Sequence, residues 1–458
     1  MPDDTPQAPA SVFGPDAPTA IPGEVVLSVN PAPAADIGIS IASIAAAEAV
    51  APAAVEGIGL AAVDSVLAPL GVRGVAQVYS PAPPEVVAGI AMAAEADAPT
   101  TVRVRYEADQ NPEQVAEKLT SLEGIAWAEP NRWREATAMP NDPQFDQQWG
   151  LTRIGCPEAW DSTTGDPSVI VAVIDTGVDL NHPELEPKLL PGQNLVDFPA
   201  GAESIKGWVL EGDFTGNDSN PQDDVGHGTH VAGTICCASD NGVGVAGVSW
   251  DVRLLPVKVL ARARELATGR VSGIGSSANI AAGIRWAADN GARVINMSLG
   301  GYAETTVERE AVEYAIGKGV VVIAAMGNDN VAQPHYPSAF DEVIAVAATD
   351  AQDKRASFSN MGSWVDVAAP GVGIQSTYWD DTYASLSGTS MAAPHVSGVA
   401  ALVLSQNGGL DAEEVGEILR KTARELKANP GDPVPNDQFG AGLIQAPTAI
   451  VAAAAASS

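Results

Sequence analysis

The sequence contains few basic residues, and this shortage limits the kinds of partner that the protein can bind. Its 458 residues include 24 Lys and Arg against 57 Asp and Glu, which gives a formal net charge of −33. Binding to a nucleic-acid backbone needs clustered basic side chains, so we expect no nucleic-acid partner. The acidic excess is spread along the chain and favours solubility and cation binding instead.

Cysteines and long apolar runs are also scarce. The only cysteines are Cys156, Cys236 and Cys237. Their odd number and spacing suit neither a disulfide framework nor a metal site, and we expect buried free thiols. No apolar run reaches the roughly 18 residues that a membrane helix needs, so we expect no membrane partner. The acidic, proline-rich start does not resemble a signal peptide, which leaves open whether one was removed or export uses another route.

The pattern of the chain predicts a small N-terminal domain followed by a large one. Residues 1–22 are rich in proline and predict a disordered lead. Residues 23–138 predict a small α+β domain, with strands near 24–29, 75–79 and 101–106. Its clearest helix begins after Asn111, which can cap it, with Pro112 in the first position.

Residues 139–449 alternate apolar strands with helices, and an alanine-rich tail follows at 450–458. The strands near 171–174, 294–298, 320–324 and 343–346 are continuous apolar runs, which is typical of parallel strands buried on both faces. Helices are expected at 280–289 and 305–318. The predicted fold is therefore a doubly wound α/β domain, with its chemistry at the carboxyl ends of the strands.

Three motifs carry residues that suit nucleophilic catalysis. Val171–Gly177 is an apolar strand that ends in Asp175, Gly226–Gly233 places His227 at the start of a helix, and Ser387–His395 places Ser390 at a glycine-rich turn. A serine hydroxyl needs a neutral imidazole to accept its proton, and a carboxylate behind that imidazole to orient it. Alone, each residue is equally typical of a turn cap, a buried polar group or a helix cap. Together they predict an Asp-His-Ser triad.

These motifs and their order resemble those of the subtilisin-like serine proteases, and in particular of thermitase-like members. The resemblance implies a serine endopeptidase with a mostly parallel, doubly wound sheet and Asn328 in the oxyanion hole. It also implies that residues 23–138 are a ferredoxin-like βαββαβ propeptide that inhibits the enzyme until the chain cuts itself. Polypeptide substrates, a secreted location and a monomeric state follow from it as expectations. An unrelated α+β domain fused to a protease is the alternative for residues 23–138.

The resemblance also implies a substrate cleft made from two extended segments and a pocket floor. The residues concerned are Gly273, Ile274 and Gly275 in one segment, Ser298, Leu299 and Gly300 in the other, and His335 at the floor. A polar floor would accept polar or aromatic side chains. The chain departs from the family pattern by an insertion around 199–211 and by a long segment at 260–272. The long segment holds Arg262, Arg264 and Arg270, which either attract acidic substrates or pair with the protein's own acidic surface.

Calcium is the cofactor that the resemblance implies, and the sequence suggests two sites for it. Calcium prefers six to eight oxygen ligands. For the first site these come from Asp142, Glu184 and Asn241, and from the backbone of Ala238, Val243 and Val245. Glu184 stands where the family usually has aspartate. For the second site they come from Asp218 and Gln222, with Asp213 or Asp197 upstream.

Two other functions remain open at this stage. A catalytically silent α/β binding module would keep the fold without the reaction, although the intact Asp175, His227, Ser390 and Asn328 argue against it. A protease dedicated to processing one partner would use the same residues with a narrower specificity.

Overall fold

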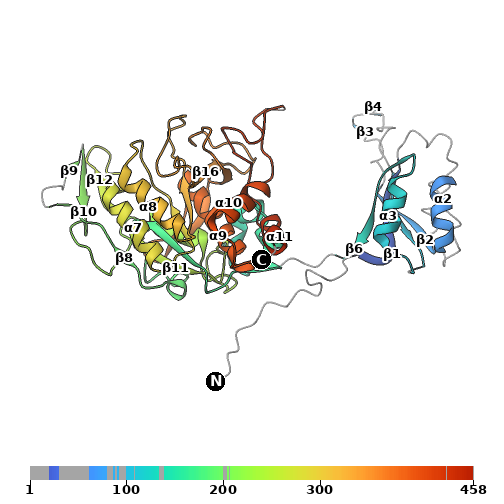
Figure 1. The fold of residues 1–458 in the computed structure, drawn as a ribbon, viewed down its shortest axis with the longest axis horizontal. Coiled ribbons are helices and arrows are strands. Elements are labelled where there is room, and N and C mark those ends of the chain that lie inside the picture. Colours follow the sequence, from blue (N-terminus) through green and yellow to red (C-terminus); the bar gives the residue numbers. More distant parts are fainter. Residues whose placement is uncertain are drawn as a thin grey trace, which may run out of the picture. The chain divides into compact units, whose positions relative to one another are not determined.

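The computed structural model describes residues 20–29, 61–79, 86–87, 90–91, 100–107, 109–133, 139–199, 204–205, 207–429 and 431–456 (Figure 1). The chain divides into two compact units between residues 136 and 137. Most of the predicted lead and residues 134–138 lie outside the described residues.

In the residues that the structure describes, the small unit has a four-stranded antiparallel sheet and two α-helices. In chain order its elements are β1 (Ala20–Val29), α2 (Ala61–Leu67), β2 (Gly74–Tyr79), β5 (Thr100–Arg105), α3 (Pro112–Thr120) and β6 (Ile125–Arg132), with a short hairpin of β3 (Val86–Val87) and β4 (Ile90–Ala91). The strand order is β2-β5-β1-β6, which matches the expected βαββαβ arrangement. The Asn111 side chain accepts a hydrogen bond from the Glu113 amide at 2.9 Å, so it caps α3 as predicted.

The large unit is built on a seven-stranded sheet in which every pair of neighbours is parallel. Its strands, in spatial order, are β17 (Val367–Pro370), β16 (Ile344–Thr349), β15 (Val321–Ala325), β14 (Val294–Met297), β7 (Ile170–Asp175), β11 (Arg253–Lys258) and β8 (Gln193–Asn194). The central strands are buried on both faces, as their continuous apolar sequences predicted.

Helices cover both faces of this sheet. On one face, α7 (Ser277–Asp289) and α8 (Thr306–Gly317) share a core with Ala172 and Ile174 of β7. On the other, α6 (His227–Ile235), α9 (Thr389–Gln406), α10 (Ala412–Lys421) and α11 (Ala446–Ala455) share a core with Val171 and Val173. The helix α11 runs through residue 449, the end expected for the large domain, and buries Ile450 and Ala453. The alanine-rich end therefore belongs to the core of the large unit.

The two segments that depart from the family pattern pair with each other. β9 (Ser204–Ile205), β10 (Trp208–Glu211), β12 (Ala261–Glu265) and β13 (Val271–Ile274) form an antiparallel sheet in the order β13-β12-β10-β9. We call it the inserted sheet. A small apolar cluster lies beneath it, made of Val196, Leu210, Ala261 and Ala263, with Ile274 against its side. A separate hairpin, β18 (Ile374–Tyr378) and β19 (Thr382–Leu386), follows later in the chain.

Two further expectations concern membranes and thiols. Within the described ranges, no helix combines the length and the apolar character needed to cross a bilayer. All three cysteines are buried and free, as predicted, and burial raises the pKa of each thiol.

Candidate active site

Asp175 and His227 are in direct contact at the carboxyl end of β7, a strand inside the large sheet. Asp175 is the last residue of β7, and His227 is the first residue of α6. The His227 Nδ1 atom lies 2.7 Å from Asp175 Oδ1, which also accepts a hydrogen bond from the Thr176 amide at 2.7 Å. Burial lowers the pKa of His227, but the charge of Asp175 and its hydrogen bond outweigh burial, so this pKa is raised above its ordinary value.

Ser390 lies in the first turn of α9 and is fixed to the end of β14. The Ser390 hydroxyl donates to the Ser298 carbonyl at 3.1 Å, and the Ser298 hydroxyl donates to the Ser390 carbonyl at 2.8 Å. Asn296 also donates to the Ser298 hydroxyl, at 3.0 Å. Ser390 and His227 line the same cleft, and the hydroxyl must turn away from Ser298 to reach the imidazole.

The Asn328 side chain is oriented by the residue that precedes Ser390. Its Oδ1 atom accepts hydrogen bonds from the Thr389 amide at 2.8 Å and from the Thr389 hydroxyl at 3.0 Å. The oxygen of the amide is therefore occupied, and the NH₂ group is the part left to face the cleft that Asn328 lines. An amide donor held in this way can stabilise negative charge on a reacting carbonyl oxygen.

The cleft has a volume of about 740 Å³ and brings together residues that are far apart in the sequence. All seven residues predicted for the substrate cleft line it, together with His227, Ser390 and Asn328. They are Gly273, Ile274, Gly275, Ser298, Leu299, Gly300 and His335. A Cβ atom at Gly273 would lie 2.6 Å from the Thr176 side chain, so only glycine fits there.

The imidazole of His335 fills the space between two glycines. A Cβ atom at Gly300 would lie 2.4 Å from His335 Cε1, and one at Gly327 would lie 3.1 Å from His335 Cδ2. The Tyr302 ring packs edge-on against the same imidazole, with the two ring centres 5.2 Å apart. His335 is 8% exposed, and burial lowers the pKa of its imidazole. The ring therefore limits the depth of the cleft at this point.

The first predicted calcium site contains two buried carboxylates. Asp142 accepts hydrogen bonds from the backbone amides of Asp240 and Asn241, and Glu184 accepts from the Val245 amide and the Tyr383 hydroxyl. In the described part of the chain, neither Asp142 nor Glu184 forms an ion pair. Burial raises the pKa of Asp142, and it raises that of Glu184 to about 7. Two buried carboxylates without a basic partner suit a bound cation.

The loop 238–245, which contacts both carboxylates, supplies the remaining predicted ligands. Asn241 uses its side-chain oxygen to accept from the Val243 amide at 2.8 Å, while Ala238 donates its amide to the Glu184 carbonyl. Gly244 leaves room for the carboxylate, because a Cβ atom there would lie 2.0 Å from Glu184 Oε1. Among the described residues, no cluster of three or more His, Cys, Asp or Glu side chains forms a metal site, so any ion here would depend on backbone and amide oxygens as well.

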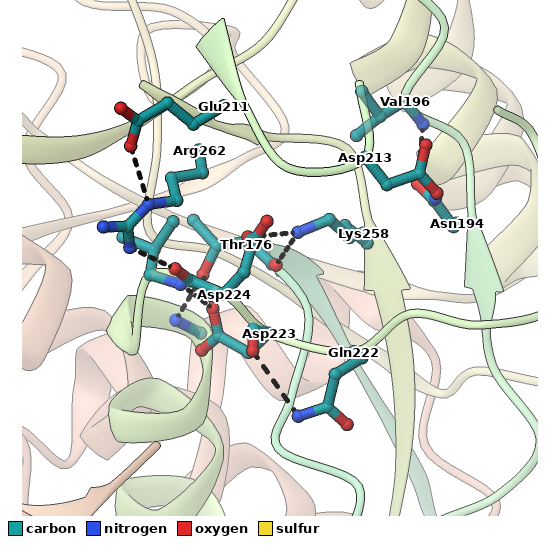
Figure 2. Close-up of polar contacts among 12 residues, drawn as sticks. Thr176, Asn194, Val196, Glu211, Asp213, Gln222, Asp223, Asp224, Lys258 and Arg262 are labelled. Carbon is teal, nitrogen blue, oxygen red and sulfur yellow. Dashed lines mark hydrogen bonds and ion pairs between the residues drawn. The ribbon is translucent and has the colours of Figure 1, made fainter. Parts of the chain in front are cut away.

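The residues of the second predicted site have other partners. The Gln222 side chain accepts from the Leu180 amide at 3.1 Å and donates to Asp179 at 3.0 Å. Asp218 is exposed and caps the Asn220 amide. The upstream candidate Asp213 accepts from Asn194 (Figure 2). No hydrogen bond between described residues joins Asp218 to Gln222, and the second site stays a prediction.

Sequence reasoning missed a group of polar residues that includes Thr176, the neighbour of Asp175, together with Asp223, Asp224 and Lys258 (Figure 2). Lys258, at the end of β11, is buried and donates to the Thr176 carbonyl at 2.7 Å and to Asp224 at 2.8 Å. Asp223 is also buried and accepts from Thr176 and from the amides of Val225 and Gly226. The sequence does hold a signal that could have identified it, because a single lysine, Lys258, stands between Val257 and Val259 in an apolar run.

Comparisons with known proteins show which family this chain is similar to. The sequence profile of the Subtilase family matches residues 166–442. Thermitase of Thermoactinomyces vulgaris is 44% identical over 288 residues, which cover 63% of this chain and 92% of that protein. A thermophilic serine proteinase of Bacillus sp. (strain AK1) is 41% identical over 317 residues, which cover 69% of this chain and 72% of that protein. The structure of a Pseudoalteromonas arctica PAMC 21717 protease superposes with a TM-score of 0.61 at 35% identity, covering 69% of this chain and all of that one.

Proposed function

This chain belongs to the subtilase family and is a serine endopeptidase, and from that premise we propose that Ser390, His227 and Asp175 form its catalytic triad. The observation that carries the proposal is the 2.7 Å contact between His227 Nδ1 and Asp175 Oδ1, in a cleft that Ser390 and Asn328 also line. The family prediction made from the sequence motifs, and the α/β fold that it implied, are confirmed.

The reaction begins when the Ser390 hydroxyl leaves the Ser298 carbonyl and donates to His227 Nε2. As the serine oxygen attacks the substrate carbonyl, His227 accepts its proton, and Asp175 stabilises the imidazolium that forms. The Asn328 NH₂ group and the Ser390 backbone amide donate to the oxyanion. His227 then protonates the leaving amine, and water releases the acyl group from Ser390 by the same steps in reverse.

Polypeptides are the substrate class, and we propose that they bind as an added strand. The segment 273–275 and the segment 298–300 lie on the cleft, and their glycines let a peptide backbone approach closely. In the sheet order β13-β12-β10-β9, β13 is an edge strand, so its outer edge can pair with a substrate backbone. Pairing through the main chain favours cleavage of many sequences over a single partner. His335 restricts the side chain that enters the cleft floor.

Calcium at the first site would have a structural role. Asp142, Glu184 and the Asn241 amide, with the carbonyls of Ala238, Val243 and Val245, supply the oxygens that this ion prefers. A bound ion would neutralise the two buried carboxylates and stabilise the folded state. At the second proposed site, at Asp218 and Gln222, the Gln222 side chain would have to exchange its contacts with Leu180 and Asp179 for the ion.

We further propose that the enzyme is made as an autoprocessed zymogen and acts outside the cell as a monomer. The small unit, with its βαββαβ order, would be the inhibitory propeptide. An acidic chain with its own inhibitor suits a secreted protease that must stay inactive until export.

Casein hydrolysis by the wild type beside Ser390→Ala tests the proposed triad. We expect hydrolysis by the wild type alone, and labelling of Ser390 by a sulfonyl fluoride in the processed protein. Full activity in Ser390→Ala would overturn the triad, and an unlabelled, inactive wild type would favour the silent binding module. A peptide library separates broad cleavage from the processing of one partner.

A further inference from the structure

The inserted sheet connects the predicted substrate strand to the loop that precedes the catalytic histidine. β13 pairs with β12 in a register that places Arg262 directly opposite Gly273. β12 in turn pairs with β10, where Glu211 is opposite Arg262. The two segments that depart from the family pattern thus meet at one arginine.

Arg262 has two partners on different parts of the fold (Figure 2). Ala261 and Ala263, its neighbours on β12, are fully buried in the apolar cluster, so Arg262 points to the other face of the sheet. Its Nε atom lies 3.2 Å from a Glu211 carboxylate oxygen, and its Nη1 atom donates to the Asp224 carbonyl at 2.5 Å. The guanidinium also lies 5.7 Å from the centre of the Trp379 ring.

Asp224 belongs to the group of residues that holds the catalytic centre together. Its carboxylate accepts from buried Lys258, which also binds the carbonyl of Thr176, next to Asp175. The loop continues through Val225 and Gly226 into His227, and Asp223 accepts from both of their amides. The start of α6 is therefore held by contacts that Arg262 does not make, and Arg262 connects β12 and its partner β13 to this anchored loop.

We propose that Arg262 is a positioning residue that fixes the substrate strand β13 relative to His227. The inference rests on the proposed function, because it assumes that β13 pairs with the substrate and that His227 is the base. The planar guanidinium reaches Glu211 with one nitrogen and Asp224 with another, and Glu211 holds it in that orientation. A lysine has a single charged nitrogen and cannot make both contacts in this geometry.

Arg264 provides a matched control on the same face of the same strand. Its Nε atom lies 2.5 Å from the other Glu211 oxygen. Among the described contacts, Arg264 has no hydrogen bond to the loop that contains Asp224. Loss of Arg264 removes a charge and an ion pair from the inserted sheet but leaves the connection to the histidine loop in place.

The test compares Arg262→Ala and Arg262→Lys with Arg264→Ala on two substrates that share the residue before the scissile bond. One is a tetrapeptide anilide, which extends along β13, and the other is an N-acetyl amino-acid ester, which does not. In both Arg262 variants we expect kcat/KM to fall about tenfold or more on the anilide, and less than about twofold on the ester, because only the anilide uses binding energy remote from the reacting atoms. Arg264→Ala should change neither value by more than about twofold.

Equal losses on both substrates would overturn the inference, since they would indicate a general structural effect, and so would an unchanged anilide rate. An equal effect of Arg264→Ala would overturn it as well. Thermal melting of each variant checks folding, and Arg262→Lys keeps the test valid if Arg262→Ala does not fold. Failure of the proposed function is distinguishable: the wild type would then hydrolyse neither substrate, or Ser390→Ala would retain full activity.

Discussion

Ser298 and Ser390 exchange two hydrogen bonds, each donating its hydroxyl to the other's carbonyl, at 2.8 and 3.1 Å. Ser298 begins a segment that we expect to pair with the substrate, and Ser390 is the proposed nucleophile. The exchange fixes the end of β14 to the first turn of α9. A peptide bound to the segment 298–300 would therefore be presented to Ser390 without a separate rearrangement of the backbone.

Loss of the Asn328 amide should reduce turnover and leave substrate affinity nearly unchanged. The NH₂ group acts on charge that develops only in the transition state, so Asn328→Ala should lower kcat by about 100- to 1000-fold. Steady-state kinetics on a peptide anilide measure this, with Ser390→Ala as the inactive reference. A large rise in KM with an unchanged kcat would place Asn328 outside the oxyanion hole.

Activity should be lost on the acid side at a pH above the ordinary pKa of histidine. His227 must be neutral to accept a proton, and Asp175 favours its charged form, so the raised pKa of His227 sets the acid limb. The activity is present above this pKa and disappears as the pH falls through it. The pH dependence of kcat/KM measures the limb, which should lie above about 6.5.

Replacement of Asp175 by asparagine provides the control for this assignment. The amide keeps the shape of the side chain but removes its charge and allows the wrong tautomer of His227, so kcat should fall by about 10⁴-fold. The acid limb of the residual activity should move to lower pH. An unchanged limb would show that another group controls it.

Chelation should lower the melting temperature, because an ion that binds only the folded state stabilises it. Asn241→Ala and Glu184→Ala should both shrink the shift that calcium produces, measured by calorimetry with calcium and with chelator. Glu310→Ala is the control for loss of a carboxylate, since Glu310 is exposed on α8 and belongs to neither predicted site. A wild-type melting temperature that ignores both calcium and chelator would contradict the metal assignment.

Replacement of His335 by glycine should deepen the floor of the cleft. The ring occupies the space between Gly300 and Gly327, and its removal makes room for a larger substrate side chain. We expect kcat/KM for phenylalanine before the scissile bond to rise about tenfold relative to alanine, measured on matched peptide anilides. An unchanged preference would show that His335 does not form the floor.

The sequence predicted local structure best where a residue type is favoured at a position for a single physical reason. Continuous apolar runs predicted the parallel strands, because a strand that is buried on both faces carries apolar side chains at every position. Asn111 predicted the start of a helix, because its side chain can cap the first backbone amides. The motifs around Asp175, His227 and Ser390 predicted residues that the fold brings together. His227 contacts Asp175, and His227 and Ser390 line one cleft.

Contacts between distant insertions could not be predicted in the same way. The pairing of β10 with β12 depends on register between segments about fifty residues apart, and nothing local specifies a partner for either strand. The arginines of 260–272 were therefore left with two interpretations. The structure pairs Arg262 and Arg264 with Glu211, and Arg270 with Glu265, which favours the protein's own acidic residues over an acidic substrate.

The last prediction concerns self-processing. If the small unit is a propeptide, the chain should cut itself between Trp133 and Met139, where residues 134–138 lie outside the described part of the structure. Small side chains at Ala136 and Ala138 suit a cleft whose floor is limited by His335. Wild-type protein should appear as two fragments and Ser390→Ala at full length, with the cut located by N-terminal sequencing of the larger fragment. If the small unit is the inhibitor, the released small fragment should still inhibit the larger one when the two are mixed. A stable, active and uncut 458-residue protein would contradict the zymogen proposal and leave the assignment as a protease intact.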